Sequence, residues 1–172
     1  MKDMKIRKAT EKDLPAVLDI FNYEIIHTPY VYLYEAWTLE YITAWFKEKQ
    51  ETKFPFLIAE HDSVVLGYAY YSLFREKEAY NTSVEYTVYI HRDHRGKGAG
   101  YQLVHALIEI AKKQNIKTFI GGVDAGNAPS IAFHERMGFT QVAHMKSVAK
   151  KFDKWLDLIF YQLMLDEELW HL

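Results

Sequence analysis

The first half of the chain combines two helical patterns with runs typical of strands. Ile6 begins a short β-type run, and Thr10 and Asp13 then mark the start of a predicted helix. The apolar positions of this helix share one face: Leu14, Val17, Phe21 and Ile25. The same spacing predicts a second helix from Leu39, Ile42 and Phe46. The aromatic segment 27–38 between them is too interrupted for a regular element, and we expect it to border a pocket.

Three β-rich segments follow the second helix. Residues 54–61 and 64–74 flank Asp62 and Ser63, which predicts an antiparallel hairpin. Residues 83–91 alternate strictly, which is the period of a strand. One face carries Val84, Tyr86, Val88 and Ile90, and the other carries Glu85, Thr87, Tyr89 and His91. This alternation predicts a strand with one buried side.

The second half of the chain reads as a crossover unit followed by two more strands. A loop rich in glycine and positive charge leads into an amphipathic helix that ends near Lys113. A short central strand at 117–123 precedes a helix from about Ala128 to Met137, which Gly138 ends as a left-handed cap. The segments 139–150 and 155–165 are β-rich, and an acidic tail follows. We predict one α/β sheet domain spanning residues 1–172.

Composition narrows the class of protein. A chain of 172 residues that is 49% hydrophobic is typical of one globular domain. Its formal net charge of −2 argues against nucleic acid or an anionic membrane as the main partner. The chain has no cysteine, which excludes disulfides, thiolate metal sites and a cysteine nucleophile. We expect a cytoplasmic protein, because the sequence shows no secretion signal or membrane-spanning apolar run.

The glycine-rich loop is suited to binding an anion. A helix start presents unpaired N–H groups and a partial positive charge, and Arg95 and Lys97 add full charges. Phosphate is the ligand that this combination favours. Lys97 is followed by glycine instead of serine or threonine, which excludes a P-loop. Tyr101 stands where the dinucleotide fingerprint needs its third glycine, which excludes that motif.

The spacing Arg95-x-x-Gly98-x-Gly100 resembles the pyrophosphate loop of the GCN5-related N-acetyltransferases (GNAT superfamily). Residues 127–139, "NAPSIAFHERMGF", resemble a second motif of that superfamily. The pairs and triplets at 84–85, 88–90 and 155–157 resemble its branch of phosphinothricin, methionine sulfoximine and methionine sulfone acetyltransferases. The likeness runs from Ile6 to Leu165. It implies a central mixed, mostly antiparallel sheet of about seven strands flanked by about four helices, and a homodimer.

The resemblance also implies acetyl-CoA as cosubstrate and a set of residues that bind it. The loop would hold the pyrophosphate, backbone N–H groups of the strand before it would polarise the thioester oxygen, and Asn127 would meet the pantetheine arm. The implied cofactor-binding residues are Val88, Tyr89, Ile90, Arg95, Gly96, Lys97, Gly98, Ala99, Gly100, Asn127 and Ser130. Asn127 equally suits a helix cap. No metal is expected, because His91 and His94 lack further ligands nearby.

Acetyl transfer to an amine needs a group that removes a proton from the ammonium. The resemblance places Glu85 in this role and makes His134 a second catalytic residue, with the direction of its proton transfer left open. Each residue could instead have no catalytic role. Glu85 would then be a solvated or salt-bridged strand glutamate, and His134 a helix histidine that caps or packs against its neighbours. The substrate would be a small amino-acid-like amine. Its predicted contacts are Phe74, Arg75, Tyr80, Val84 and Glu85, with Tyr30, Tyr32 and Tyr34 as further walls.

Three other functions remain to be compared with this one. A related transferase would acetylate a polyamine or a peptide N-terminus. A binding module would take up acetyl-CoA without catalysis, although it would not need both Glu85 and His134. A nucleotide-hydrolysing switch would need the P-loop pattern that the sequence lacks.

Overall fold

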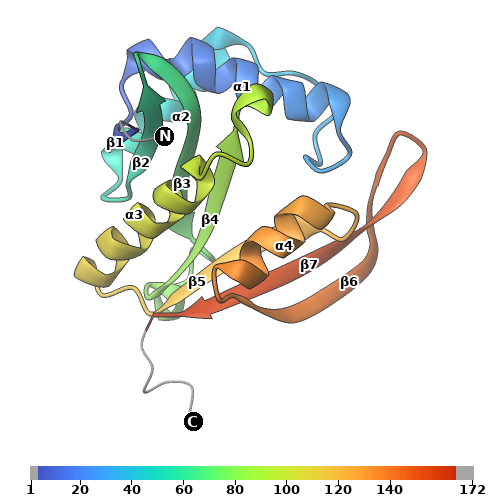
Figure 1. Ribbon diagram of the computed structural model, residues 1–172. Helices are drawn as coiled ribbons and strands as arrows, with labels where there is room; N and C mark the ends of the chain where they lie inside the picture. The colour runs from blue at the N-terminus through green and yellow to red at the C-terminus, as the bar shows by residue number, and fades with distance from the viewer. Residues whose placement is uncertain (1–3, 166–172) are drawn as a thin grey trace.

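The computed structural model describes residues 4–165, which form one sheet of seven strands with four α-helices (Figure 1). The strands are β1 (Lys5–Lys8), β2 (Phe56–His61), β3 (Val64–Leu73), β4 (Ser83–Ile90), β5 (Thr118–Asp124), β6 (Thr140–Lys151) and β7 (Lys154–Met164). The helices are α1 (Leu14–His27), α2 (Leu39–Glu51), α3 (Ala99–Lys113) and α4 (Ala128–Arg136), with short 3-10 turns at Glu11–Asp13, Glu78–Tyr80 and Arg92–His94. The predicted fold class is confirmed, and the acidic tail lies outside the described residues.

Local sequence explains where several elements begin and turn. The Asp13 carboxylate accepts hydrogen bonds from the backbone N–H and the hydroxyl of Thr10, which caps the start of the first helical segment. Asp62 and Ser63 both have positive φ, the geometry of a two-residue hairpin turn between β2 and β3. Gly138 has φ of 84° and ends α4, as its position in the sequence predicts.

The sheet order is β1-β2-β3-β4-β5-β7-β6, and its one parallel pair is β4 with β5. That pair is short: Ser83, Val84 and Glu85 face Thr118, Phe119 and Ile120. Within residues 4–165 no further ladder joins the two strands beyond Glu85. Figure 1 shows them separating from a shared base, which leaves a gap in the middle of the sheet.

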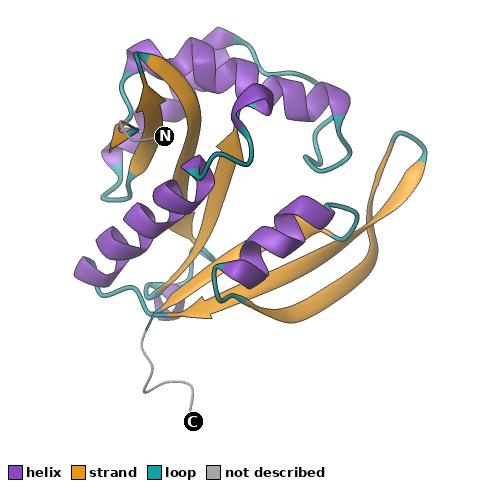
Figure 2. Cartoon of the chain, in the orientation of Figure 1, coloured by secondary structure: helices purple, strands orange, loops and turns teal. Residues whose placement is uncertain are grey.

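Helices cover both faces of the sheet (Figure 2). A smaller apolar cluster joins α1 and α2 to one face through Leu14, Val17 and Phe46. The larger core packs α3 and the segment after α4 against the other face, with Val84 and Tyr86 among its buried side chains. The opposite side of β4 is also covered, since Tyr89 packs against the smaller cluster. The fully buried residues of this strand, Val84 and Tyr86, nevertheless share one face, whereas Tyr89 is half-buried, so the prediction of one buried side is confirmed.

No helix within residues 4–165 is both long and apolar enough to cross a membrane.

Candidate active site

The glycine-rich loop has the backbone geometry that its composition predicts. Gly96 and Gly98 have φ of 72° and 88°, a region that side chains with a Cβ rarely adopt. Gly98 is the N-cap of α3, so the first N–H groups of this helix follow the turn directly. A cavity of about 470 Å³, the loop cavity, lies against this turn and against α4. Its lining includes Val88, Ile90, Arg95, Gly96, Gly98, Ala99, Gly100 and Ser130.

Two smaller cavities continue from the loop cavity through the gap between β4 and β5. The central cavity, of about 280 Å³, shares Val88, Ile90 and Ser130 with the loop cavity and adds His134. The third cavity, of about 250 Å³, shares Thr87 and Asp124 with the central cavity and contains Glu85; we call it the Glu85 cavity. Because each cavity shares lining residues with the next, the three lie in a row from the α3 and α4 side of the sheet to the α1 side, and we call this row the passage.

Glu85 lies at the end of the short parallel ladder, half-buried in its cavity. Burial raises the pKa of its carboxyl group, while the positive charge of Arg75 acts in the opposite direction. A Cβ atom on Gly122 would stand 3.3 Å from Glu85 Oε1, so this glycine keeps the space beside the carboxylate open. A carboxylate with a raised pKa is a stronger proton acceptor than a solvated one.

His134 lies on α4, 4% exposed, and lines the central cavity. Its ring stacks on Tyr161 at 5.1 Å, and Nδ1 is 2.7 Å from the Ser130 carbonyl oxygen. Burial lowers the pKa of the imidazole below its usual value, with the Ser130 carbonyl in partial opposition. Since a carbonyl oxygen only accepts, Nδ1 carries the proton of the neutral ring, and Nε2 keeps its lone pair.

The hydroxyl of Tyr86 is a polar group without a partner in this region. Tyr86 is 5% exposed and lines the central cavity, yet within residues 4–165 its buried hydroxyl makes no hydrogen bond. An unsatisfied buried hydroxyl costs about 1–3 kcal/mol.

The two cations of the loop take different positions. Arg95 lines both the loop cavity and the central cavity, and its guanidinium forms a close ion pair with the buried Glu24 of α1. Lys97 is not among the side chains that line these cavities. Its Nζ donates to the Asp93 carbonyl oxygen at 2.7 Å, within the loop itself.

Asn127 and Tyr89 each have a structural role beside their place in the passage. Asn127 Oδ1 accepts a hydrogen bond from Ser130 N at 3.2 Å, which caps α4, and the residue also lines the central cavity. The ring of Tyr89 packs edge-on against Phe21, and the residue lines both the central and the Glu85 cavities.

The predicted substrate contacts divide into two groups. Val84 is 0% exposed within the larger core and lines neither the central cavity nor the Glu85 cavity, so its contact with substrate stays a prediction. Its neighbour Glu85 faces the opposite side because strand side chains alternate. The other three form a cluster: Arg75 stacks over the Phe74 ring at 3.9 Å, and Phe74 meets Tyr80 at 6.1 Å. Strand register places this cluster beside Glu85, because Ser72 of β3 pairs with Glu85 and Phe74 follows two residues later.

The aromatic segment after α1 does border a pocket. We call residues 28–38 the tyrosine loop. Tyr30, Val31 and Tyr32 line the Glu85 cavity, as expected for the two tyrosines. Tyr34 does not line it; the residue is 75% exposed, and its hydroxyl donates to the Lys150 carbonyl oxygen at 2.6 Å.

Two buried carboxylates of the passage were not predicted. Asp124, 6% exposed, lines both the central and Glu85 cavities, where its side chain accepts from Tyr32 Oη at 2.9 Å. The sequence feature that could have identified it is an acidic residue directly after the predicted central strand at 117–123. Glu24 lines the central cavity. Its signal is an acidic residue three positions after Phe21, on the apolar face of the first helix.

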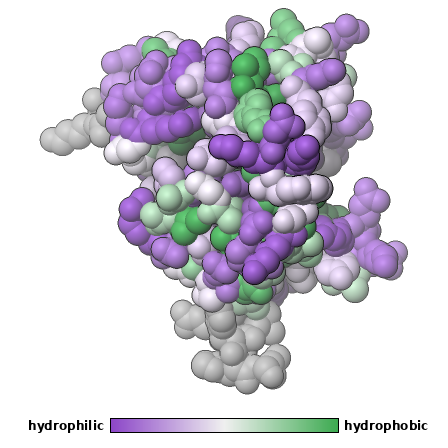
Figure 3. Space-filling view, turned by 90° about the vertical axis from the view of Figure 1, so that its right-hand side faces the viewer, coloured by the Kyte–Doolittle hydropathy of each residue, from purple (hydrophilic) through white to green (hydrophobic). Residues whose placement is uncertain are grey.

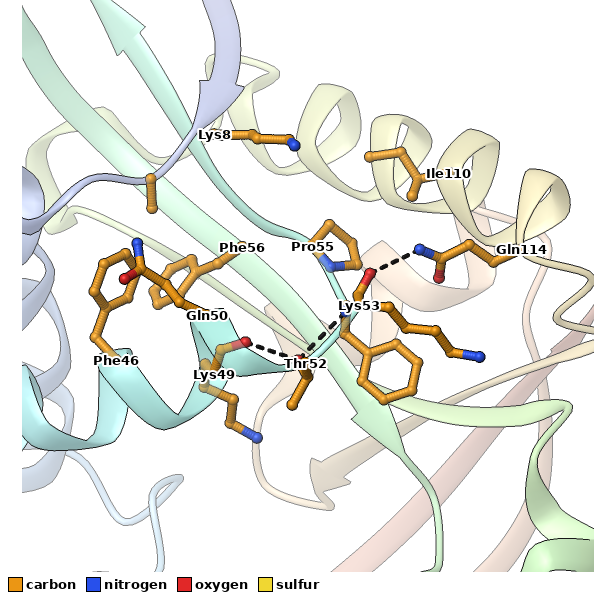
Figure 4. A pocket seen from close by; sticks show the side chains of 12 residues that line it. Lys8, Phe46, Lys49, Gln50, Thr52, Lys53, Pro55, Phe56, Ile110 and Gln114 are labelled. Atoms are coloured by element: carbon orange, nitrogen blue, oxygen red, sulfur yellow. Dashed lines mark hydrogen bonds between the residues drawn. The ribbon is translucent and has the colours of Figure 1, made fainter.

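A separate cavity of about 510 Å³ lies at the other end of α3 (Figure 4). It is lined by residues such as Lys8, Phe46, Pro55 and Ile110, and Gln114 closes it through a hydrogen bond to the Lys53 carbonyl oxygen. None of the predicted site residues line it. In the part of the chain that the structure describes, no group of three or more His, Cys, Asp or Glu is arranged to hold a metal ion.

Comparison with known proteins agrees with this geometry. The chain is 37% identical over 164 residues to an L-methionine sulfoximine/L-methionine sulfone acetyltransferase of Salmonella typhimurium, covering 95% of this chain and 96% of that protein. It is 31% identical to a phosphinothricin N-acetyltransferase of Streptomyces viridochromogenes, over 92% and 86% of the two chains. A Salmonella typhimurium acetyltransferase solved with its cofactor acetyl-CoA superposes with a TM-score of 0.91 at 36% identity, over 96% and 95% of the chains.

The profile of the acetyltransferase (GNAT) domain family matches residues 6–160, nearly the whole described chain. The family match, the seven-stranded sheet open between β4 and β5, and the passage that leads from the glycine loop to Glu85 are therefore consistent with one another. The protein belongs to the GNAT family and is an acetyltransferase.

Proposed function

We propose that this protein uses acetyl-CoA to acetylate the amino group of a small amino-acid-like substrate of the methionine sulfoximine, methionine sulfone or phosphinothricin type. The observation that carries the proposal is the passage through the sheet. The loop cavity opens on the α3 and α4 side, and the Glu85 cavity is bordered by the tyrosine loop on the α1 side. Two reactants can enter from opposite faces and meet in the central cavity.

Residues of the passage fit acetyl-CoA. The turn at Gly96 and Gly98 and the first N–H groups of α3 suit a pyrophosphate. The edge of β4 beyond Glu85 lacks a ladder partner toward β5, so its backbone groups are available to a pantetheine arm and a thioester oxygen. Acetyl-CoA, when bound, supplies the acetyl group as an activated thioester.

Glu85 is the proposed general base. It accepts a proton from the substrate ammonium, directly or through a water molecule, and leaves the nitrogen lone pair free to attack. A C–N bond then forms while the C–S bond breaks, and the second proton that the nitrogen loses as the amide forms balances the proton that the departing thiolate gains. Transfer is direct, in a ternary complex, since the passage offers no cysteine for an acyl-enzyme.

His134 is proposed as a proton acceptor or relay beside this centre. Its neutral ring carries hydrogen on Nδ1, so Nε2 can receive a proton but has none to give until it has taken one up. We therefore propose that His134 first takes up a proton, where the sequence left the direction open.

The proposal is tested by measuring release of the CoA thiol with methionine sulfone, methionine sulfoximine and phosphinothricin, and in parallel with polyamines and short peptides. We expect turnover with at least one of the first three. Turnover with polyamines or peptides alone would assign the chain to a different acceptor class within the family. Calorimetric binding of acetyl-CoA with no thiol release from any amine would identify a binding module instead.

The role of Glu85 is tested by Glu85→Gln, which keeps the size of the side chain but removes its basicity. We expect kcat to fall by roughly 10²- to 10⁴-fold, the usual contribution of a general base, with acetyl-CoA affinity unchanged. Glu109→Gln, on the exposed surface of α3, is the matched control and should retain full activity. A Glu85→Gln enzyme as active as that control would remove Glu85 from the mechanism.

The proposal includes a homodimer formed through β6. This strand is at the edge of the sheet and exposes Val142, Met145 and Val148, while Phe152 and Trp155 stand exposed at its turn into β7. The hairpin projects from the body of the molecule on the right of Figure 1. Figure 3 looks onto that side of the molecule and shows apolar surface among polar residues. An open apolar edge strand is suited to pairing with a second copy. The cytoplasmic location and the single domain over residues 1–172 stay predictions.

A further inference from the structure

Lys151 is a buried cation that the proposed mechanism does not use. It is the last residue of β6 and is 3% exposed, in a hairpin whose other lysines are not buried. Its Nζ donates to the Ile25 carbonyl oxygen at 2.6 Å and to the Val31 carbonyl oxygen at 2.7 Å. Burial of an ammonium group is costly unless hydrogen bonds compensate it, so these two acceptors hold the side chain in place.

The two acceptors belong to different parts of the chain. Ile25 is in the last turn of α1, where carbonyl groups lack helical partners and the helix dipole favours a cation. Val31 is in the tyrosine loop and is itself 6% exposed. One ammonium group from the C-terminal hairpin therefore ties together the end of α1 and the loop that follows it.

Further hydrogen bonds fix the same loop to the C-terminal half of the sheet. Tyr32 Oη is within hydrogen-bond distance of Asp124 Oδ2 at 2.9 Å and of the Asp157 carbonyl oxygen at 3.2 Å. Tyr34 Oη donates to the Lys150 carbonyl oxygen at 2.6 Å. Lys151 is the only one of these donors that bonds to the loop backbone, at the residue between Tyr30 and Tyr32.

Tyr30, Val31 and Tyr32 form a wall of the Glu85 cavity. A shift of the Val31 backbone would therefore move three consecutive wall residues together. We propose that Lys151 is a positioning residue for substrate specificity: by holding the Val31 carbonyl, it fixes the wall that limits the side chain of the amine substrate. This inference rests on the proposed function of the Glu85 cavity as the amine site.

The test compares Lys151→Met with Lys150→Met. Methionine keeps most of the unbranched stem but donates no hydrogen bond, and Lys150 is the neighbouring residue, with an exposed side chain paired to Asp153 at 3.4 Å. Kinetics are measured with acetyl-CoA and a series of amino acids and methionine sulfone that differ in side-chain length. Chymotrypsin cleavage within the tyrosine loop is measured on the same proteins without substrate.

For Lys151→Met we expect KM for the amine to rise about tenfold, which corresponds to about 1.4 kcal/mol, with kcat within about twofold and KM for acetyl-CoA unchanged. Preference among side-chain lengths should fall by a similar factor, and cleavage of the loop should become faster. Lys150→Met should match the wild type in every measurement. Tyr32→Phe removes a different loop hydrogen bond and should change amine KM in the same direction, which keeps the test available if Lys151→Met does not fold.

Two results would show that Lys151 only stabilises the fold and would overturn the inference. One is a fall in kcat together with equally large rises in KM for the amine and for acetyl-CoA. The other is a lower melting temperature with unchanged preference among amine side-chain lengths. Loop cleavage no faster than in Lys150→Met would overturn it independently of any activity. Failure of the wild type to acetylate any amine would contradict the proposed function instead, while the cleavage comparison would still report on the loop.

Discussion

His134 shows how far a single residue can be understood before its surroundings are known. The motif at 127–139 marks the position, but its ring partners Tyr86 and Tyr161 come from β4 and β7 and are brought together only by the fold. Its burial, its tautomer and its lowered pKa all depend on these distant segments. Lys151 is the opposite case, since a lysine in a hairpin with Lys146, Lys150 and Lys154 carries no sequence signal of burial.

The lowered pKa of His134 makes stability depend on pH. In the unfolded chain a histidine binds a proton near pH 6.5, whereas the buried ring does so only at a lower pH. Between these two values the unfolded state holds more protons, so the free energy of unfolding falls as pH decreases. His134→Gln should show a smaller drop in melting temperature from pH 7.5 to 5.5 than the wild type. The same drop in both proteins would contradict the assignment, and exposed His105→Gln is the control.

Among the elements, strands and helices with clear periodicity were predicted well. The alternation of β4 correctly separated Val84 from Glu85, yet the pattern could not show that the second face is covered as well. That cover comes from α1 and the tyrosine loop, and the loop has no periodic pattern to read. The functional wall of the cavity was therefore less predictable than the regular elements that support it.

The turn before α3 gives a prediction at this scale. Gly98→Ala places a Cβ at φ of 88°, a strain of about 1–2 kcal/mol, although no neighbouring atom blocks the space. If the free loop relaxes to avoid the strain, acetyl-CoA should bind about 5- to 30-fold more weakly by calorimetry. Gly138→Ala is the matched control, with φ of 84° and equally open space at the end of α4. It should lose similar stability but keep its affinity, and equal affinities in both variants would count against a role of the turn.

For the molecule as a whole, assembly is the main prediction. Trp155 is 67% exposed at the start of β7, so Trp155→Glu should leave the folded chain intact. If copies pair through the β6 and β7 hairpin, this variant should be monomeric in analytical ultracentrifugation at concentrations where the wild type is a dimer. Val64→Glu, an equally polar change at the exposed start of β3, should not alter the mass. A wild type that is monomeric throughout would contradict the proposed dimer.

The three residue pairs between β4 and β5 determine how firmly the two halves of the sheet are held together. Among residues 4–165 they are the only backbone ladder between the first four strands and the last three, so the sheet is joined at its centre by a seam shorter than either strand that forms it. A long, flexible guest lying along that opening would act as a brace between the halves as well as a reactant. The amide protons of residues 86–90 would record its arrival first, through slower exchange with solvent.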